Sequence, residues 1–404
     1  MSYVPPHKRQ SKGSGEPSPL PASLPRQFKR GLNFRSPRTN ADQSGKIVYA
    51  NKAISRWLAV GLDDDGDHLP SGVFLKPVSV EAIERRSGEK LALAKNCMAN
   101  EEDETGWDHS KKPWVQIAET VMPDLVSSFE VVKSEIEGQS MEEIKPTLVA
   151  RFGKILFYGS PTFPVETCGE MNTETSLRQL KRSFYTNIPS SFVENVTLRI
   201  VPEIGLSFED EKDIYQVKLS DKSRPDSTIT CKCSVSKAEQ RLELYKVELN
   251  QVRHMVVDVS CLNKDLDMRL MLCTKRILTD ISEKEKDSIR DLITSAVIDS
   301  SVKGGLRWPL GKESSGDRYS VVGVWHTISK TYKNSSMRLK VRHADRFDFK
   351  SSRGEVTEET VLKLKGITSE LHGQGLETDL TSDMLKDAVK MMWEHFLSCG
   401  NTII

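Results

Sequence analysis

The chain has 404 residues, with 58 Lys and Arg against 57 Asp and Glu, 37% hydrophobic residues, 24 Gly and 18 Pro. These values exclude collagen-like, disulfide-scaffold and wholly disordered proteins. At roughly 150 residues per domain, the length fits one large domain or two ordinary ones, each with a buried core.

Positive charge is concentrated at the amino terminus. Nine Lys and Arg residues occur up to Lys46, against the two acids Glu16 and Asp42, so this segment carries +7 and the remainder −6. Residues 1–45 are rich in Pro, Ser, Arg and Gly and cannot bury enough apolar surface to offset chain entropy. We expect a disordered basic arm, which either attracts nucleic acid or an acidic protein surface, or only keeps the protein soluble.

The compartment follows from the cysteines and the first residues. Seven scattered cysteines, an odd number, do not suit a secreted disulfide framework. Met1 is followed by polar residues and prolines, and no apolar run is long enough to span a membrane. We expect a cytoplasmic or nuclear protein with no membrane contact.

Residues 46–200 are predicted to form a helix-rich region. After short extended runs, apolar residues recur at helical spacing over residues 114–136, with Pro123 kinking or dividing the helix. Residues 177–184 and 191–200 show two more helical patterns.

Residues 201–404 are predicted to be rich in strands. Alternating apolar residues mark seven strands, at residues 214–219, 228–235, 242–249, 252–259, 268–278, 319–328 and 337–349. Ser282 and Glu285 form a capping box ahead of a helix, and a last helix is expected over about residues 382–398. The predicted fold class is α+β, helix-rich in its amino-terminal part and with a mainly antiparallel sheet in its carboxy-terminal half. Whether residues 46–404 form one domain or two stays open.

Cys231 and Cys233 raise the question of a zinc site, because His254 and Cys261 lie nearby in the sequence. The two cysteines, however, share a strand face with Ile229, as core residues do. We therefore predict a core position for both cysteines and no metal.

The glycine-containing loop at residues 303–312 has some features of a phosphate-binding loop. Its glycines expose backbone donors, and Arg307 and Lys312 add positive charge. It is not a Walker A motif, because Glu313 stands where a Ser or Thr would bind magnesium. A structural loop anchored by Trp308 is the alternative.

A basic stripe is the strongest binding signal in the sequence. In the strand from residue 337, strict alternation buries every second residue and places Arg338, Lys340 and Arg342 on the other face. Such a stripe follows a phosphate backbone, or else forms a solvated face paired with acids on a neighbouring strand. We interpret these residues, with Arg307 and Lys312, as candidate nucleic-acid or phosphate contacts.

A short motif near the amino terminus suggests a protein partner. It consists of Tyr3, Val4, Pro5, Pro6, His7, Lys8 and Arg9. The segment resembles a motif of translation-linked DEAD-box RNA helicases that lies in a disordered arm implicated in partner contacts. Paired prolines pre-set an extended segment, which lowers the ordering entropy of docking. The helicase core motifs are absent, so the resemblance implies a partner contact and no helicase activity.

The whole chain also resembles a plant family of uncharacterised proteins. The segments that carry this resemblance are residues 1–9, 177–189, 248–258 and 304–312. The resemblance implies a common architecture and supplies no functional residues.

These observations favour a non-catalytic interaction protein that joins an RNA-related assembly through its basic arm, without a cofactor. The alternative is an enzyme acting on a phosphorylated or nucleotide substrate, with residues 303–312 as the phosphate-binding element.

Overall fold

The computed structural model describes residues 47–60, 73–80, 83, 88–96, 112–137, 142–158, 177, 180–224, 227–236, 240–279, 281–316, 318–373 and 378–398. The chain divides into two units, Met1–Arg38 and Thr39–Ile404, and the described residues all belong to the second. The predicted arm at residues 1–45 lies outside the described residues.

In the described residues, the first half of the chain contributes five strands and four helical segments. Its elements are β1 (Val48–Val60), β2 (Val73–Val78), β3 (Leu91–Asn96), α2 (Pro113–Glu137), β4 (Glu142–Tyr158), β5 (Arg182–Tyr185), α4 (Ser190–Asn195), the π-helix η4 (Val196–Ile200) and α5 (Val201–Glu203).

The second half is mostly long strands. Its elements are β6 (Ser207–Asp221), β7 (Thr228–Val235), β8 (Leu242–Leu249), β9 (Val252–Cys261), β10 (Asp267–Leu278), α6 (Glu283–Thr294), β11 (Val297–Ile298), η5 (Lys303–Gly305), β12 (Leu306–Arg307), β13 (Ser314–Ser315), β14 (Tyr319–Lys333), β15 (Met337–Asp348), β16 (Arg353–Leu364), α7 (Lys365–His372) and α8 (Thr378–His395).

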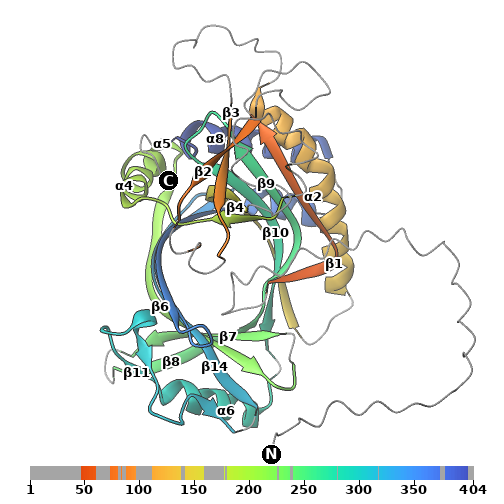
Figure 1. The fold of residues 1–404 in the computed structure, drawn as a ribbon. Coiled ribbons are helices and arrows are strands. Elements are labelled where there is room, and N and C mark those ends of the chain that lie inside the picture. Colours follow the sequence, from red (N-terminus) through yellow and green to blue (C-terminus); the bar gives the residue numbers. More distant parts are fainter. Residues whose placement is uncertain are drawn as a thin grey trace, which may run out of the picture. The chain divides into compact units, whose positions relative to one another are not determined.

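Strand β4 closes the main sheet into a ring. It runs antiparallel to β10 over most of its length, and it also pairs with β16, where Arg151 lies opposite Val361 and Val149 opposite Lys363. The pairings from β10 through β8, β7, β6, β14, β15 and β16 therefore return through β4 to β10. Figure 1 shows these strands curving around a common centre. Because successive side chains alternate between faces, each strand of the ring presents one row inward and one outward.

The outer face of one side of the ring carries the main hydrophobic core. Helices α2, α7 and α8 cover it, with Leu125, Phe129 and Phe396 buried against alternate residues of β4, β9 and β10 such as Phe152 and Leu270. Figure 1 shows α2 running along this side of the sheet. Burial of these side chains at about 25 cal/mol per Å² fixes which face of each strand points outward.

A second core lies under α6, on the outer face of β6, β7 and β14. Cys231 and Cys233 belong to it and are fully buried beside Ile229, Leu292 and Ile293. The predicted core position of the two cysteines is therefore confirmed. Burial raises the pKa of Cys233 to about 12, so its thiol stays protonated and is a poor metal ligand.

Several predicted elements are confirmed. The helix over residues 114–136 is α2, which contains Pro123, and Ser282 forms the capping box of α6 with Glu285. The strands predicted at residues 228–235 and 242–249 match β7 and β8.

The predicted fold class is wrong in its division of the chain. Residues 46–200 are not a helix-rich region, because they supply β1 to β5, including the 17-residue strand β4 that closes the ring. The predicted helix at residues 177–184 is wrong at its end, where Arg182–Tyr185 form strand β5. β4 was missed because Pro146 and Gly153 interrupt its pattern. A Cβ at Gly153 would lie 2.0 Å from the Tyr185 carbonyl oxygen, so the glycine permits the close approach of β5.

None of the helices in the described residues is long and apolar enough to cross a membrane.

Candidate anion-binding site

Basic side chains from β4, β7, β8, β10, β15 and β16 lie on the inner face of the ring, beside a small buried apolar cluster of Val149, Val256, Met271, Cys273 and Val361. Each basic side chain occupies the alternation position opposite a core residue. We define the cationic cluster as eight of these residues with the two carboxylates among them: Arg151 (β4), Lys232 (β7), Lys246 and Glu248 (β8), Lys275 (β10), Lys340, Arg342 and Arg346 (β15), and Glu359 and Lys363 (β16). Eight cations against two carboxylates leave a marked excess of positive charge inside the ring.

Four members of the cluster have no counter-charge in contact. Among the described residues, Arg151, Lys275, Lys340 and Lys363 form no ion pair and no side-chain hydrogen bond, unlike their neighbours in the cluster. All four are only partly exposed. These cations have therefore lost part of their hydration without gaining a counter-charge. Their remaining exposure leaves them accessible to an anion from solvent.

Burial and neighbouring cations lower the pKa of two lysines of the cluster. Burial, together with the charges of Lys363 and Lys232, lowers the pKa of Lys275 to about 7. Burial and the charges of Arg342 and Lys232 lower the pKa of Lys340 to about 8.

Lys363 and Arg151 respond in the same way. Burial and the charges of Arg338 and Lys340 lower the pKa of Lys363 to about 8. Burial lowers the pKa of Arg151 to about 10, although Glu359 opposes the change. The ring therefore concentrates like charges at a cost that an anion would relieve.

The two carboxylates of the cluster each bind two cations. Glu248 lies 2.9 Å from Lys232 Nζ and 2.8 Å from Lys246 Nζ. Burial opposes its ionisation, but the charges of Lys232 and Lys275 outweigh burial and lower its pKa to about 2. Glu359 lies 2.7 Å from Arg342 Nε and also contacts Arg346. Both carboxylates are consequently committed to cations of the cluster.

Replacing Glu359 by Gln is expected to destabilise the protein by about 3–5 kcal/mol, because Arg342 and Arg346 lose their buried partner. Urea unfolding measures this effect. The matched control is Glu358→Gln, at the residue next to Glu359 on β16. It removes a more exposed carboxylate that lies 2.7 Å from His343 of β15, and it should cost about 1 kcal/mol or less. Equal effects of the two substitutions would show that Glu359 does not organise the arginines.

The structure places the predicted stripe of Arg338, Lys340 and Arg342 on the inner face of the ring. Their alternation with buried Leu339 and Val341 is as predicted. Their surroundings are not the solvated face of the alternative interpretation, because closure of the ring turns this face inward. Arg342 pairs with buried Glu359, and Arg338 Nε lies 2.6 Å from Glu209.

Arg307 and Lys312 lie apart from this stripe. Arg307 Nε is 2.9 Å from Asp299, and the preceding glycines pack against the outer side of the ring: a Cβ at Gly305 would lie 3.0 Å from the Tyr215 ring. Trp308 donates a hydrogen bond from Nε1 to the Leu292 carbonyl at 2.9 Å. These contacts favour the second interpretation of residues 303–312, a structural loop anchored by Trp308, over a phosphate-binding loop.

The predicted and the observed candidate residues differ in two further respects. Tyr3 to Arg9 lie outside the described residues, so their partner contact stays a prediction. Sequence reasoning missed Lys275, Lys363 and Arg151, which join Lys340 only through the long-range pairing of β10, β16 and β4.

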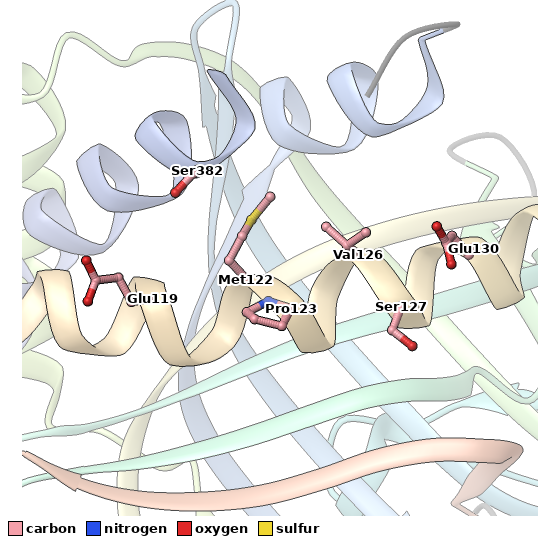
Figure 2. A pocket seen from close by; sticks show the side chains of 7 residues that line it. All are labelled: Glu119, Met122, Pro123, Val126, Ser127, Glu130 and Ser382. Atoms are coloured by element: carbon pink, nitrogen blue, oxygen red, sulfur yellow. The ribbon is translucent and has the colours of Figure 1, made fainter. Parts of the chain in front are cut away.

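A separate open hollow of about 480 Å³ lies between α2 and α8. Its lining residues are Glu119, Met122, Pro123, Val126, Ser127, Glu130 and Ser382. Figure 2 shows the side chains along α2, with Ser382 on α8. Because its charged lining residues are glutamates, this hollow does not suit an anion.

The chain belongs to the family described as Domain of unknown function (DUF7903), whose model matches residues 41–396. No curated protein matches the sequence. The resemblances of the sequence to a plant family and to helicase arms stay predictions.

The chain is similar to several solved structures, at low sequence identity and low TM-score. The S. pombe Pct1 RNA triphosphatase has 12% identity and a TM-score of 0.40, covering 69% of this chain and 90% of its own. The same protein in complex with the Spt5 CTD gives 13% identity, a TM-score of 0.41, and coverage of 69% and 92%. A putative adenylate cyclase from Bacillus halodurans has 8% identity and a TM-score of 0.21, covering 52% of this chain and 94% of its own. All three TM-scores lie below 0.5, so these similarities carry no conclusion about function.

Proposed function

We propose that the protein binds the oligophosphate group of a small molecule, or a short polyphosphate, inside the ring of strands. The observation that carries this proposal is the position of four cations, Arg151, Lys275, Lys340 and Lys363, on the inner face of the ring without a counter-charge in contact among the described residues; burial and neighbouring cations lower the pKa of each. An anion with several charges would relieve this repulsion and supply charge-assisted hydrogen bonds.

The layout of the cations favours an extended ligand. Arg338, Lys340, Arg342 and Arg346 follow one face of β15, and the eight residue steps from Arg338 to Arg346 span about 27 Å. Lys275 and Lys363 join them from β10 and β16, so a chain of phosphates would meet cations along its length. A nucleic-acid duplex cannot use these residues in the same way, because their side chains point into the ring and not onto an open surface.

The geometry favours direct contact between side chains and phosphate. Glu248 and Glu359 are engaged with cations. Among the residues that the structure describes, no three His, Cys, Asp or Glu side chains are grouped to hold a metal ion. We therefore propose that side chains of the ring bind the phosphate groups directly, and the contribution of the amino-terminal arm to an RNA-related assembly remains a separate proposal.

Calorimetric titration of the full chain with sodium tripolyphosphate tests the proposal. We expect saturable binding with one site per chain, unchanged by EDTA. The double variant Lys340→Gln, Lys363→Gln should weaken binding by about 100-fold, because each lost charge-assisted hydrogen bond is worth about 1.5–3 kcal/mol. The control Lys330→Gln removes an exposed lysine of β14 and should bind like the parent.

Two results would contradict the proposal. One is the absence of any heat of binding at millimolar tripolyphosphate. The other is a double variant that folds normally and binds as tightly as the parent, which would move the binding site away from the ring.

A further inference from the structure

Trp325 is the large aromatic side chain on the inner face of β14. The register of the sheet places it between Gln216 of β6 and Arg346 of β15. Its neighbour Val324 packs into the outer core, so alternation turns Trp325 toward the interior of the ring. The indole thus stands at one end of the cationic cluster, next to Arg346.

Cations lie against the ring of Trp325 from the strands on either side. Lys218 Nζ of β6 is 3.5 Å from the ring centroid, and Arg346 Cζ of β15 is 4.7 Å from it. These contacts leave the indole face engaged with cations. A nucleobase therefore gains no stacking platform on this residue, and the indole offers its edge to a ligand.

The indole N–H of Trp325 is buried and has no hydrogen-bond partner among the described residues. Two other tryptophans satisfy theirs: Trp57 donates to Ser260 Oγ at 2.9 Å, and Trp308 donates to the Leu292 carbonyl at 2.9 Å. An indole nitrogen is only a donor, and a buried donor without an acceptor costs about 1–3 kcal/mol. A cation against the ring face withdraws electron density, which makes the N–H a stronger donor.

We infer that Trp325 Nε1 donates a hydrogen bond to an oxygen of the ligand's terminal phosphate, so that this end of the cluster receives phosphate and not a nucleobase. The inference rests on the proposed function and specifies the orientation of the ligand. Arg346 would contact the same phosphate, since it lies opposite Trp325 in the sheet.

Affinity measurements on the full chain test this assignment. Tripolyphosphate and ATP are titrated against the parent, Trp325→Phe and the control Trp308→Phe, whose indole bonds outside the ring. We expect Trp325→Phe to weaken both ligands by about tenfold, because one hydrogen bond to a charged group is lost from each. The control should change either affinity by less than about twofold.

The outcomes separate this inference from the proposed function. A parent that binds tripolyphosphate while Trp325→Phe binds it equally well overturns the inference alone. A loss for tripolyphosphate that ATP does not share overturns the orientation, because it shows the base end at Trp325. A parent that does not bind tripolyphosphate overturns both.

A spectroscopic readout keeps the inference testable if Trp325→Phe does not fold. In the parent labelled with ¹⁵N-tryptophan, tripolyphosphate should move one of the six indole N–H signals downfield and slow its exchange with solvent. No movement of any indole signal on saturation would overturn the assignment.

Discussion

The affinity for tripolyphosphate should fall by at least about 100-fold between about pH 6.5 and about pH 9.5. In the unliganded ring, the pKa of Lys275 is about 7, and those of Lys340 and Lys363 are about 8. A bound polyanion raises all three pKa values toward or above their ordinary 10.5, so binding takes up protons wherever the free protein has lost them. Binding is therefore strongest below about pH 7 and weakens as the pH rises through the unliganded pKa values.

The charged groups around these lysines set their pKa values and so the size of the pH dependence. Glu248 raises the pKa of Lys275, whereas Lys232 and Arg342 lower it. Lys212 lowers the pKa of Lys340 from β6, and Arg338 lowers that of Lys363 from β15. The balance is repulsive, so the ligand and not the protein supplies the missing negative charge.

Calorimetry in buffers of different ionisation enthalpy measures the protons taken up. The control is the triple variant Lys275→Arg, Lys340→Arg, Lys363→Arg, in which the guanidinium groups stay protonated and the decline with pH should flatten. Because tripolyphosphate ionises equally in both titrations, the pH dependence that remains in the triple variant measures the contribution of the ligand's own ionisation. An affinity of the parent that stays constant or rises with pH would show that these lysines are not the binding groups.

The sequence was sufficient for elements whose pattern is local. β7 and β8 were predicted to the residue, because each is a short alternating run between polar turns. The core position of Cys231 followed from its face alone. β16 was missed because Glu358, Glu359 and Thr360 make its middle read as a polar loop, although its Glu359 is only 2% exposed. A polar residue that points into a ring cannot be told from one that points into solvent by the alternation of one strand.

The same limit applies to the binding site. Alternation identified Arg338, Lys340 and Arg342 as one row, and the structure retains that row on β15. Lys275 and Lys363 are the single lysines of their strands, and neither belongs to a row of alternating basic residues that would mark a binding face. They become part of a site only because β4 pairs with both β10 and β16, and such long-range pairing is not encoded in any local pattern.

Replacing Lys275 by Met should raise the free energy of unfolding by about 1–3 kcal/mol at pH 6.5 and weaken tripolyphosphate binding by about tenfold or more. The folded state disfavours the protonated amine, since burial and neighbouring cations lower its pKa from 10.5 to about 7. This cost is fully present below about pH 7 and disappears as the pH rises toward 10.5, so the stabilising effect of Met should shrink over the same range.

Urea unfolding of the parent and of Lys275→Met at about pH 6.5 and about pH 10 measures the difference, with Lys330→Met as the exposed control on β14. Saturating tripolyphosphate should reverse the order, because the ligand stabilises the protein that binds it more tightly. A Met variant that is less stable than the parent without ligand would show that attraction to Glu248 outweighs the repulsion from Lys363 and Lys232. The reversal itself distinguishes a binding residue from a structural one, since a lysine held only for packing would gain nothing from an anion.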